Sequence, residues 1–277
     1  MPFIERLTNE TTPKRVYAYL KLVDEKTMRK EEVVNYLQPK FVDNTSFIAN
    51  KVYSFVNNAQ LISESSDGNI KLDIDRKEIA TMKAFRKIIA KRVFQHEDYM
   101  FSRFTSWYLM RGEKVFEENA EALEIAFNQE LNADRTLPNE YNKTNITGWR
   151  TWAAFLGFGY IHNKVLIPNT AVRLHDLLID ANIPKDKSMP LKQFMDWLHL
   201  AAPELDGGKI NEVNQGDSPY TKQTLSLGLS SGLRALHDQG LLELKYVSDA
   251  IDTWYLQKAS HDITDKVSEI TIRGVEI

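Results

Sequence analysis

The chain of 277 residues contains no cysteine. This absence excludes disulfide bonds, thiolate metal sites and cysteine nucleophiles together. Any metal site would have to be built from His, Asp and Glu, yet the six histidines are scattered, with no HxH or HxxxH pair. The sequence also lacks a Gly-rich phosphate loop, a nucleophile elbow and a Rossmann fingerprint. We therefore expect neither a metal nor a cofactor.

Long hydrophobic runs are missing as well. No stretch approaches the roughly 18 to 20 apolar residues that span a bilayer. The N-terminal "MPFIERLTNETTPKR" has no continuous apolar core of the kind that a secretion signal needs. We expect a cytoplasmic protein without membrane partners, whose 43% hydrophobic content is enough to bury a core.

The chain has no excess of positive charge, since its formal net charge is -3. Proteins that clamp a long nucleic acid usually carry a basic excess, which displaces counterions from the phosphates. Any DNA binding must therefore use local basic patches. Alternatively, the chain is one subunit of an assembly in which other chains supply the positive charge.

Three short helices and a hairpin are predicted near the N-terminus. The segments 12–23, 27–39 and the stretch from Thr45 or Ser46 onward carry apolar residues at helical spacing. The tight-turn sequence "SDGN" then separates Leu61 and Ile62 from an alternating stretch that ends at Ile74. Three helices followed by a hairpin predict a winged helix-turn-helix module.

The pattern of a helix that runs into a hairpin recurs twice. In "TLSLGLSSGLRALHDQGLLELKYVSDAIDTWYLQ", four leucines line one helical face, Gly240 suits a helix cap, and "LLELKY" and "IDTWYL" flank a turn at Ser248-Asp249. A weaker copy is "ITGWRTWAAFLGFGYIHNKVLIP", residues 146–168. The last stretch, "VSEITIRGVEI", alternates as a strand would, and its pairing partner stays open.

These patterns predict a mainly α fold with small β-hairpins, in which two or three winged helix-turn-helix modules are joined by a helical segment. The expected divisions are an N-terminal winged helix at 1–77, a helical segment with a basic and then an acidic helix at 78–135, a second winged-helix cassette at 136–170, and a C-terminal winged helix at 171–277. Whether the middle cassette is a true winged helix is left open.

The third predicted helix is a candidate for DNA reading. Its exposed face would present Asn50, Lys51, Ser54 and Asn57, and asparagine can pair bidentately with adenine in the major groove. However, any solvated helix has a polar face, and a helix with one lysine supplies little phosphate affinity. A docking surface for protein is therefore an equal alternative. The corresponding middle and C-terminal helices offer Arg150 and Arg234.

The segment "TMKAFRKIIAKRVF", residues 81–94, is the best nucleic-acid candidate by charge. Lys83, Arg86, Lys87 and Lys91 gather along one broad helical face. They could contact phosphates, or they could be neutralised by the Glu-rich segment 112–131 or simply be solvated.

Two further patterns have ordinary explanations. The aromatic residues between Phe94 and Tyr108, and those of "WRTWAAFLGFGY", could stack on bases, but at helical spacing such residues usually form core. The tripeptide Glu243-Leu244-Lys245 is similar to the Glu-x-Lys of metal-dependent nucleases, but it is common by chance and lies in a predicted hairpin.

The run "WRTWAAFLGFGYIHNKVLIP", followed by "NTAVRL", resembles segments of winged-helix proteins of bacterial defence and DNA-modification islands, such as the DpdG-like family. The resemblance implies a non-catalytic subunit that acts beside helicases, nucleases or modification enzymes, and it transfers no catalytic residues. The helix-and-hairpin pattern is also similar to the tandem winged-helix subunits that bind the kleisin or SMC parts of chromosome-loop machines.

From the sequence we expect a non-catalytic adaptor subunit that binds DNA, other protein subunits or both. The expected protein partners are an ATPase, an SMC-like protein or a nuclease in a bacterial antiviral complex. Two alternatives stay open, namely a stand-alone winged-helix transcriptional regulator and, more remotely, a metal-dependent nuclease.

Overall fold

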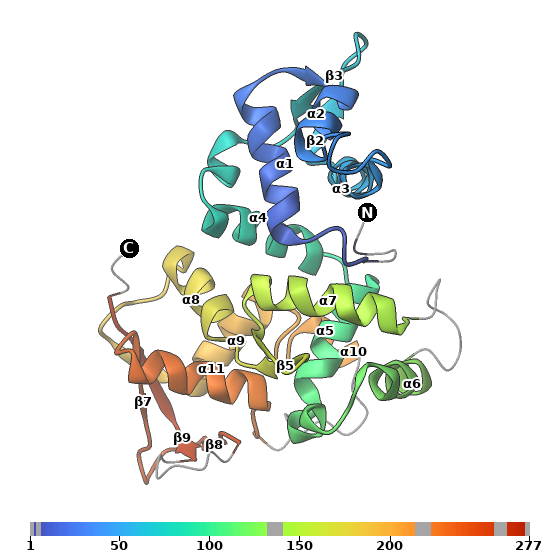
Figure 1. Ribbon diagram of the computed structural model, residues 1–277. Coiled ribbons are helices and arrows are strands. Elements are labelled where there is room, and N and C mark those ends of the chain that lie inside the picture. Colours follow the sequence, from blue (N-terminus) through green and yellow to red (C-terminus); the bar gives the residue numbers. More distant parts are fainter. Residues whose placement is uncertain (1–2, 4–6, 132–140, 214–222, 258–264, 275–277) are drawn as a thin grey trace.

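The protein is mainly helical, with small antiparallel sheets of two or three strands, and this confirms the predicted fold class (Figure 1). The computed structural model describes residues 3, 7–131, 141–213, 223–257 and 265–274. In Figure 1 the first helices and the first hairpin form an upper lobe, above a larger lower body. None of the helices in the described ranges combines the length and apolar character that a membrane span requires.

The N-terminal lobe contains the predicted helices and hairpin. Its elements are α1 (Pro13–Glu25), β1 (Met28–Arg29), α2 (Lys30–Leu37), α3 (Phe47–Asn58), β2 (Ile62–Glu64) and β3 (Asn69–Leu72). Thr12 caps α1 by accepting a hydrogen bond from the backbone of Arg15, and Pro13 occupies the first turn. The three strands form one antiparallel sheet in the order β1-β3-β2, with Gly68 at a positive φ of 79° in the turn of the hairpin.

The C-terminal part repeats this order of elements with longer connections. It contains α8 (Ala171–Asp180), β6 (Ser188–Pro190), α9 (Leu191–Ala201), α10 (Lys209–Val213), α11 (Leu227–Asp238), β7 (Leu242–Lys245), β8 (Trp254–Tyr255), β9 (Lys266–Val267) and β10 (Glu269–Ile272). Its three-stranded sheet has the order β6-β10-β7. As in the N-terminal lobe, the last strand is central, and it lies between a short strand that enters a helix and the strand that follows the last helix of that part.

The predicted hairpin after α11 is wrong in its second strand. Strand β7 pairs with β10, with Leu242 opposite Ile272, whereas Trp254 and Tyr255 pair with β9. The reason lies in burial: Ile270 and Ile272 of β10 are buried on the sheet, so the alternating last stretch completes this sheet.

The middle of the chain supplies the helices that join the two parts. Its elements are η1 (Arg76–Ile79), α4 (Met82–Phe94), α5 (Met100–Met110), η2 (Gly112–Phe116), α6 (Ala120–Leu131), α7 (Lys143–Leu156), β4 (Gly159–His162) and β5 (Val165–Pro168). Helix α7 ends at Gly157, whose φ is +91°, and the β4–β5 hairpin turns at Asn163 and Lys164, both at positive φ. The predicted middle helix is therefore present as α7, and the predicted hairpin is present as the two-stranded sheet β4-β5.

Helix α7 lies at the centre of the hydrophobic core. Trp152 is fully buried, stacks on Phe55 of α3 at 5.0 Å, and donates a hydrogen bond to the carbonyl of Thr11 at 2.7 Å. Trp149 donates to Thr105 of α5 at 2.8 Å. The two tryptophans of α7 are thus part of the core, where Trp152 packs against the N-terminal lobe. They do not form an exposed platform for bases.

Candidate functional site

The exposed face of α3 is one of the surfaces that sequence reasoning singled out. Because Ala49, Val52, Phe55 and Val56 face the core, the opposite side of the helix is left to solvent. The predicted site residues on this exposed side are Asn50, Lys51, Ser54 and Asn57.

Two of these side chains have local contacts within α3. The amide nitrogen of Asn50 donates to the carbonyl of Ser46 at 2.9 Å. The ammonium of Lys51 lies 5.6 Å from the ring centroid of Phe47. Lys51 is the one cation on α3, so this face carries little charge for phosphate.

The hairpin beside α3 carries more negative than positive charge. Its exposed acids are Glu64, Asp67 and Asp73, against one exposed lysine, Lys71. The Glu64 carboxylate accepts a hydrogen bond from the Tyr53 hydroxyl of α3 at 3.1 Å, so acid and helix are held side by side. Hydrogen bonds from the Ser65 hydroxyl, and then from the backbone and Asn69, lower the pKa of Asp67. A hairpin with this charge would repel a DNA backbone at neutral pH.

Large apolar side chains are exposed between α2 and α3, a feature that sequence reasoning missed. Phe41 is 91% exposed and Val42 is 71% exposed, while Tyr36 at the end of α2 and Phe47 at the start of α3 are more than half exposed. We call these four residues the α2–α3 apolar patch. The sequence did contain a signal for this patch. The apolar pair Phe41-Val42 lies in a short segment between two helices that each have a buried apolar face of their own, so the pair is not needed for the core. Exposed apolar groups of this size, close together in the chain, are typical of protein contacts.

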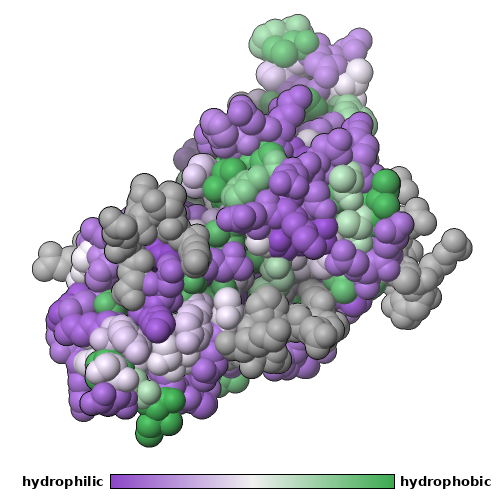
Figure 2. Space-filling view, turned by 90° about the horizontal axis from the view of Figure 1, so that it is seen from below, coloured by the Kyte–Doolittle hydropathy of each residue, from purple (hydrophilic) through white to green (hydrophobic). Residues whose placement is uncertain are grey.

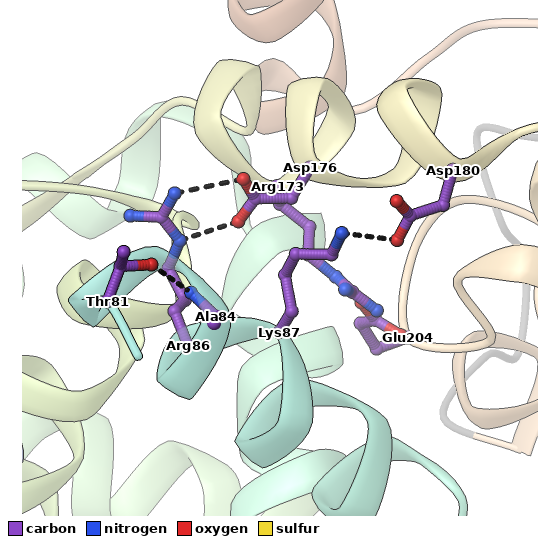
Figure 3. A network of polar contacts seen from close by, with 8 residues as sticks. All are labelled: Thr81, Ala84, Arg86, Lys87, Arg173, Asp176, Asp180 and Glu204. Atoms are coloured by element: carbon purple, nitrogen blue, oxygen red, sulfur yellow. Dashed lines mark hydrogen bonds and ion pairs between the residues drawn. The ribbon is translucent and has the colours of Figure 1, made fainter. Parts of the chain in front are cut away.

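The basic helix α4 directs much of its charge into the molecule. Arg86 donates from Nε and a terminal nitrogen to the carboxylate of Asp176 on α8, at 2.6 and 2.9 Å, and Lys87 pairs with Asp180 (Figure 3). Thr81 caps the start of the helix by accepting from the backbone of Ala84 at 3.1 Å. Two of the four predicted phosphate contacts are thus used to hold α4 against α8.

The neutralising acids come from α8 and not from the Glu-rich helix, which corrects one alternative considered above. Within the segment 112–131, Glu118 and Glu130 pair with Arg111, and Glu121 pairs with Lys143. The acidic segment therefore has its own cations nearby.

The remaining basic candidates lie in different surroundings. Lys91 is exposed and Lys83 is partly exposed, and neither has an ion-pair partner in the part of the chain that the structure describes. Arg150 on α7 is partly buried, and burial lowers its pKa. Arg234 on α11 is 7% exposed, with a terminal nitrogen 3.2 Å from Asp265. The structure thus does not bring the ten predicted residues together on one surface.

The Glu-x-Lys tripeptide on β7 is part of a surface charge cluster. The Glu243 carboxylate lies 3.1 Å from the ammonium of Lys245 and also pairs with Arg273. These contacts lower the pKa of Glu243. Across the described ranges, no three His, Asp or Glu side chains come together as metal ligands would.

On the face seen in Figure 2, the surface is mostly hydrophilic, and hydrophobic side chains occur in small separate groups.

A model of the DpdG-like family matches residues 6–250. No curated protein and no solved structure matches the chain. The family match covers most of the sequence, so the chain belongs to the DpdG-like family and is associated with a Dpd-type defence system.

Proposed function

We propose that this DpdG-like protein is a non-catalytic docking subunit of a larger bacterial complex that acts on DNA. We also propose that residues 13–72 and 171–272 form two winged helix-turn-helix units. The support is the shared order of elements and the shared strand order, in which the last strand lies between a short entry strand and the strand after the last helix of the unit. Winged helices serve both nucleic-acid and protein binding, so their surfaces must decide between the two.

The α2–α3 apolar patch is the observation that carries the proposal. A surface that binds DNA needs cations, whereas this one combines a 91%-exposed phenylalanine with a single lysine on α3 and a hairpin in which exposed acids outnumber bases. Protein interfaces favour exposed aromatic side chains at their centre, surrounded by polar groups. The amides of Asn50 and Asn57 would form part of such a polar rim.

The non-catalytic part of the proposal rests on the contacts of Glu243, the residue that a nuclease would need as a metal ligand. Its carboxylate already has two cationic partners, Lys245 and Arg273. A carboxylate bound in this way is poorly prepared to hold a divalent metal with an attacking water. The antiviral role is proposed from family membership, and the enzymes of the system would be separate chains.

The decisive experiment is purification of the tagged chain from its native host. We expect a stable protein partner to elute with the wild type, and Phe41→Asp to lose it. Because Phe41 is almost fully exposed, this variant should fold normally. Ile251→Asp is the matched control, since Ile251 is 100% exposed but lies in the C-terminal part, and it should retain the partner. A wild-type chain that elutes alone, or a Phe41→Asp variant that keeps its partner, would overturn the proposal.

The stand-alone regulator makes a different prediction, which fluorescence anisotropy with short DNA duplexes can measure. The docking proposal predicts weak binding without sequence preference by the isolated chain. A dimer with sequence preference, a steep loss of affinity with salt, and sensitivity to Asn50→Ala and Asn57→Ala would favour the regulator instead.

A further inference from the structure

A groove of about 850 Å³ lies between α4 and the C-terminal helices α8, α9 and α10. Helices α4 and α8 run antiparallel along it, because Lys87 pairs with Asp180 at one end of α8 while Arg173, near its other end, lies 5.6 Å from the ring of Phe94. The α4 wall extends from Ala84 to Gln95. At 1.5 Å per residue this wall is about 17 Å long, or roughly three helical turns.

The lining of the groove combines charged side chains with a set of apolar ones. Ile88 of α4, Leu177 of α8 and Trp197 of α9 are all partly open to solvent, and Leu200 of α9 is 87% exposed. The exposed Leu200 thus lines the same groove as these partly covered side chains. This surface is long enough, and apolar enough, to bury one face of another protein segment.

The walls decide which backbone conformation fits. Both long walls are α-helices, whose backbone N–H and C=O groups are hydrogen-bonded within each helix. An extended segment would find no strand edge with which to pair in this groove, and its own polar backbone would be buried unpaired. A helix arrives with its backbone groups already bonded and offers side chains at i, i+3, i+4 and i+7.

The charges around the groove indicate which charged residues should lie beside the apolar face of that helix. Three cations of the groove are paired internally: Lys87 with Asp180, Lys209 with Glu97 at 3.0 Å, and Arg173 with Glu204 at 2.8 Å. Two exposed lysines of the lining, Lys77 and Lys91, have no ion-pair partner among the described residues. The Glu78 carboxylate accepts a hydrogen bond from the backbone of Asp75. Glu78 has no ion-pair partner among the described residues either, so the unpaired charge at the rim is net positive, with two lysines against one glutamate.

We infer that this groove binds an amphipathic helix of a partner protein, with an apolar face against Leu200 and Trp197 and carboxylates that meet Lys77 and Lys91. This surface is separate from the α2–α3 apolar patch, so the protein would have two independent points of contact within its complex. The inference therefore goes beyond the proposed function, and each of the two can fail alone.

The test titrates the full chain into fluorescent 20-residue model helices and follows the anisotropy. The first peptide has leucines at i, i+3, i+4 and i+7 with flanking glutamates; the second replaces the glutamates by lysines, and the third has a central proline. We expect the acidic helix to bind at least tenfold more tightly than either of the others.

Variants then locate the site. Leu200→Glu should weaken the acidic helix at least tenfold and Lys91→Glu at least fivefold, and both residues are exposed, so the fold should tolerate the changes. Ile251→Glu and Lys187→Glu are matched controls on exposed residues outside the groove and should bind as the wild type does. Phe41→Asp should also bind normally, which separates this site from the α2–α3 apolar patch.

Several outcomes would overturn the inference. These are equal binding of the lysine or proline peptide, unchanged binding by Leu200→Glu, or no binding at all. A wild-type dimer in sedimentation analysis that Leu200→Glu converts to a monomer would also overturn it, since the occupant would then be a second copy of the chain.

Discussion

The ion pair between Arg86 of α4 and Asp176 of α8 can be broken by replacing either residue. We expect the two replacements to lower the free energy of unfolding by different amounts. The side chain of Asp176 is 3% exposed, whereas that of Arg86 is 21% exposed. Removal of one partner of a buried pair costs about 3–5 kcal/mol, because the other charge stays desolvated. Arg86→Ala leaves a carboxylate in a nearly dry site, so we expect a loss of about 3 kcal/mol in the free energy of unfolding. Asp176→Ala leaves a long side chain that can turn its charge to water, and we expect a loss of about 1–2 kcal/mol.

Urea unfolding at pH 7, followed by tryptophan fluorescence, measures both variants and the double variant. The double variant should cost less than the sum of the two, because no lone charge remains buried. The control is Lys87→Ala, whose partner Asp180 is 61% exposed, and which should cost less than about 1 kcal/mol. An Asp176→Ala variant less stable than Arg86→Ala, or strict additivity in the double variant, would show that the buried carboxylate is not the costly charge of this pair.

Three further predictions concern other parts of the chain. Gly157→Ala should destabilise the protein by at least about 2 kcal/mol more than Gly240→Ala in the same urea assay. Both glycines have positive φ, but only a Cβ at position 157 would meet backbone, 2.6 Å from the nitrogen of Arg173. Equal losses would contradict this prediction. Neither the wild type nor Glu243→Ala should cut DNA in Mg²⁺ or Mn²⁺, and a metal-dependent cleavage that this variant abolishes would establish the nuclease. Burial raises the pKa of Asp206, so the folded state keeps a proton that the unfolded chain has lost above its ordinary pKa of about 3.9. The free energy of unfolding should therefore fall as pH rises from about 4 towards this raised pKa, and Asp206→Asn should remove that slope; an unchanged slope would contradict the assignment.

Local patterns predicted the three N-terminal helices and the first hairpin because their determinants are close in sequence. The "SDGN" turn places Gly68 at positive φ, and the Thr12-Pro13 pair starts α1 as N-cap and first-turn residues usually do. The resemblance to the DpdG-like family is also confirmed, since the family model covers the run that begins at Trp149.

Long-range pairings were not predictable from these patterns. Strand β7 pairs with β10, and nothing in "LELK" distinguishes that partner from the nearer "IDTWYL". The acids that neutralise Arg86 and Lys87 lie about 90 residues away on α8, whereas sequence reasoning looked to the nearer glutamates. Arg234 follows the exposed-face spacing of α11, but the fold covers it. Local spacing identifies a face, and tertiary packing decides whether that face reaches solvent.

We propose that the N-terminal lobe binds another protein through α3 and the α2–α3 apolar patch. Amide hydrogen exchange, compared between the free chain and the complex purified from the host, tests it most directly. We expect slower exchange in residues 40–58 of the complex, with the β2–β3 hairpin tip less affected. Unchanged exchange in residues 40–58, with protection confined to other elements, would contradict it.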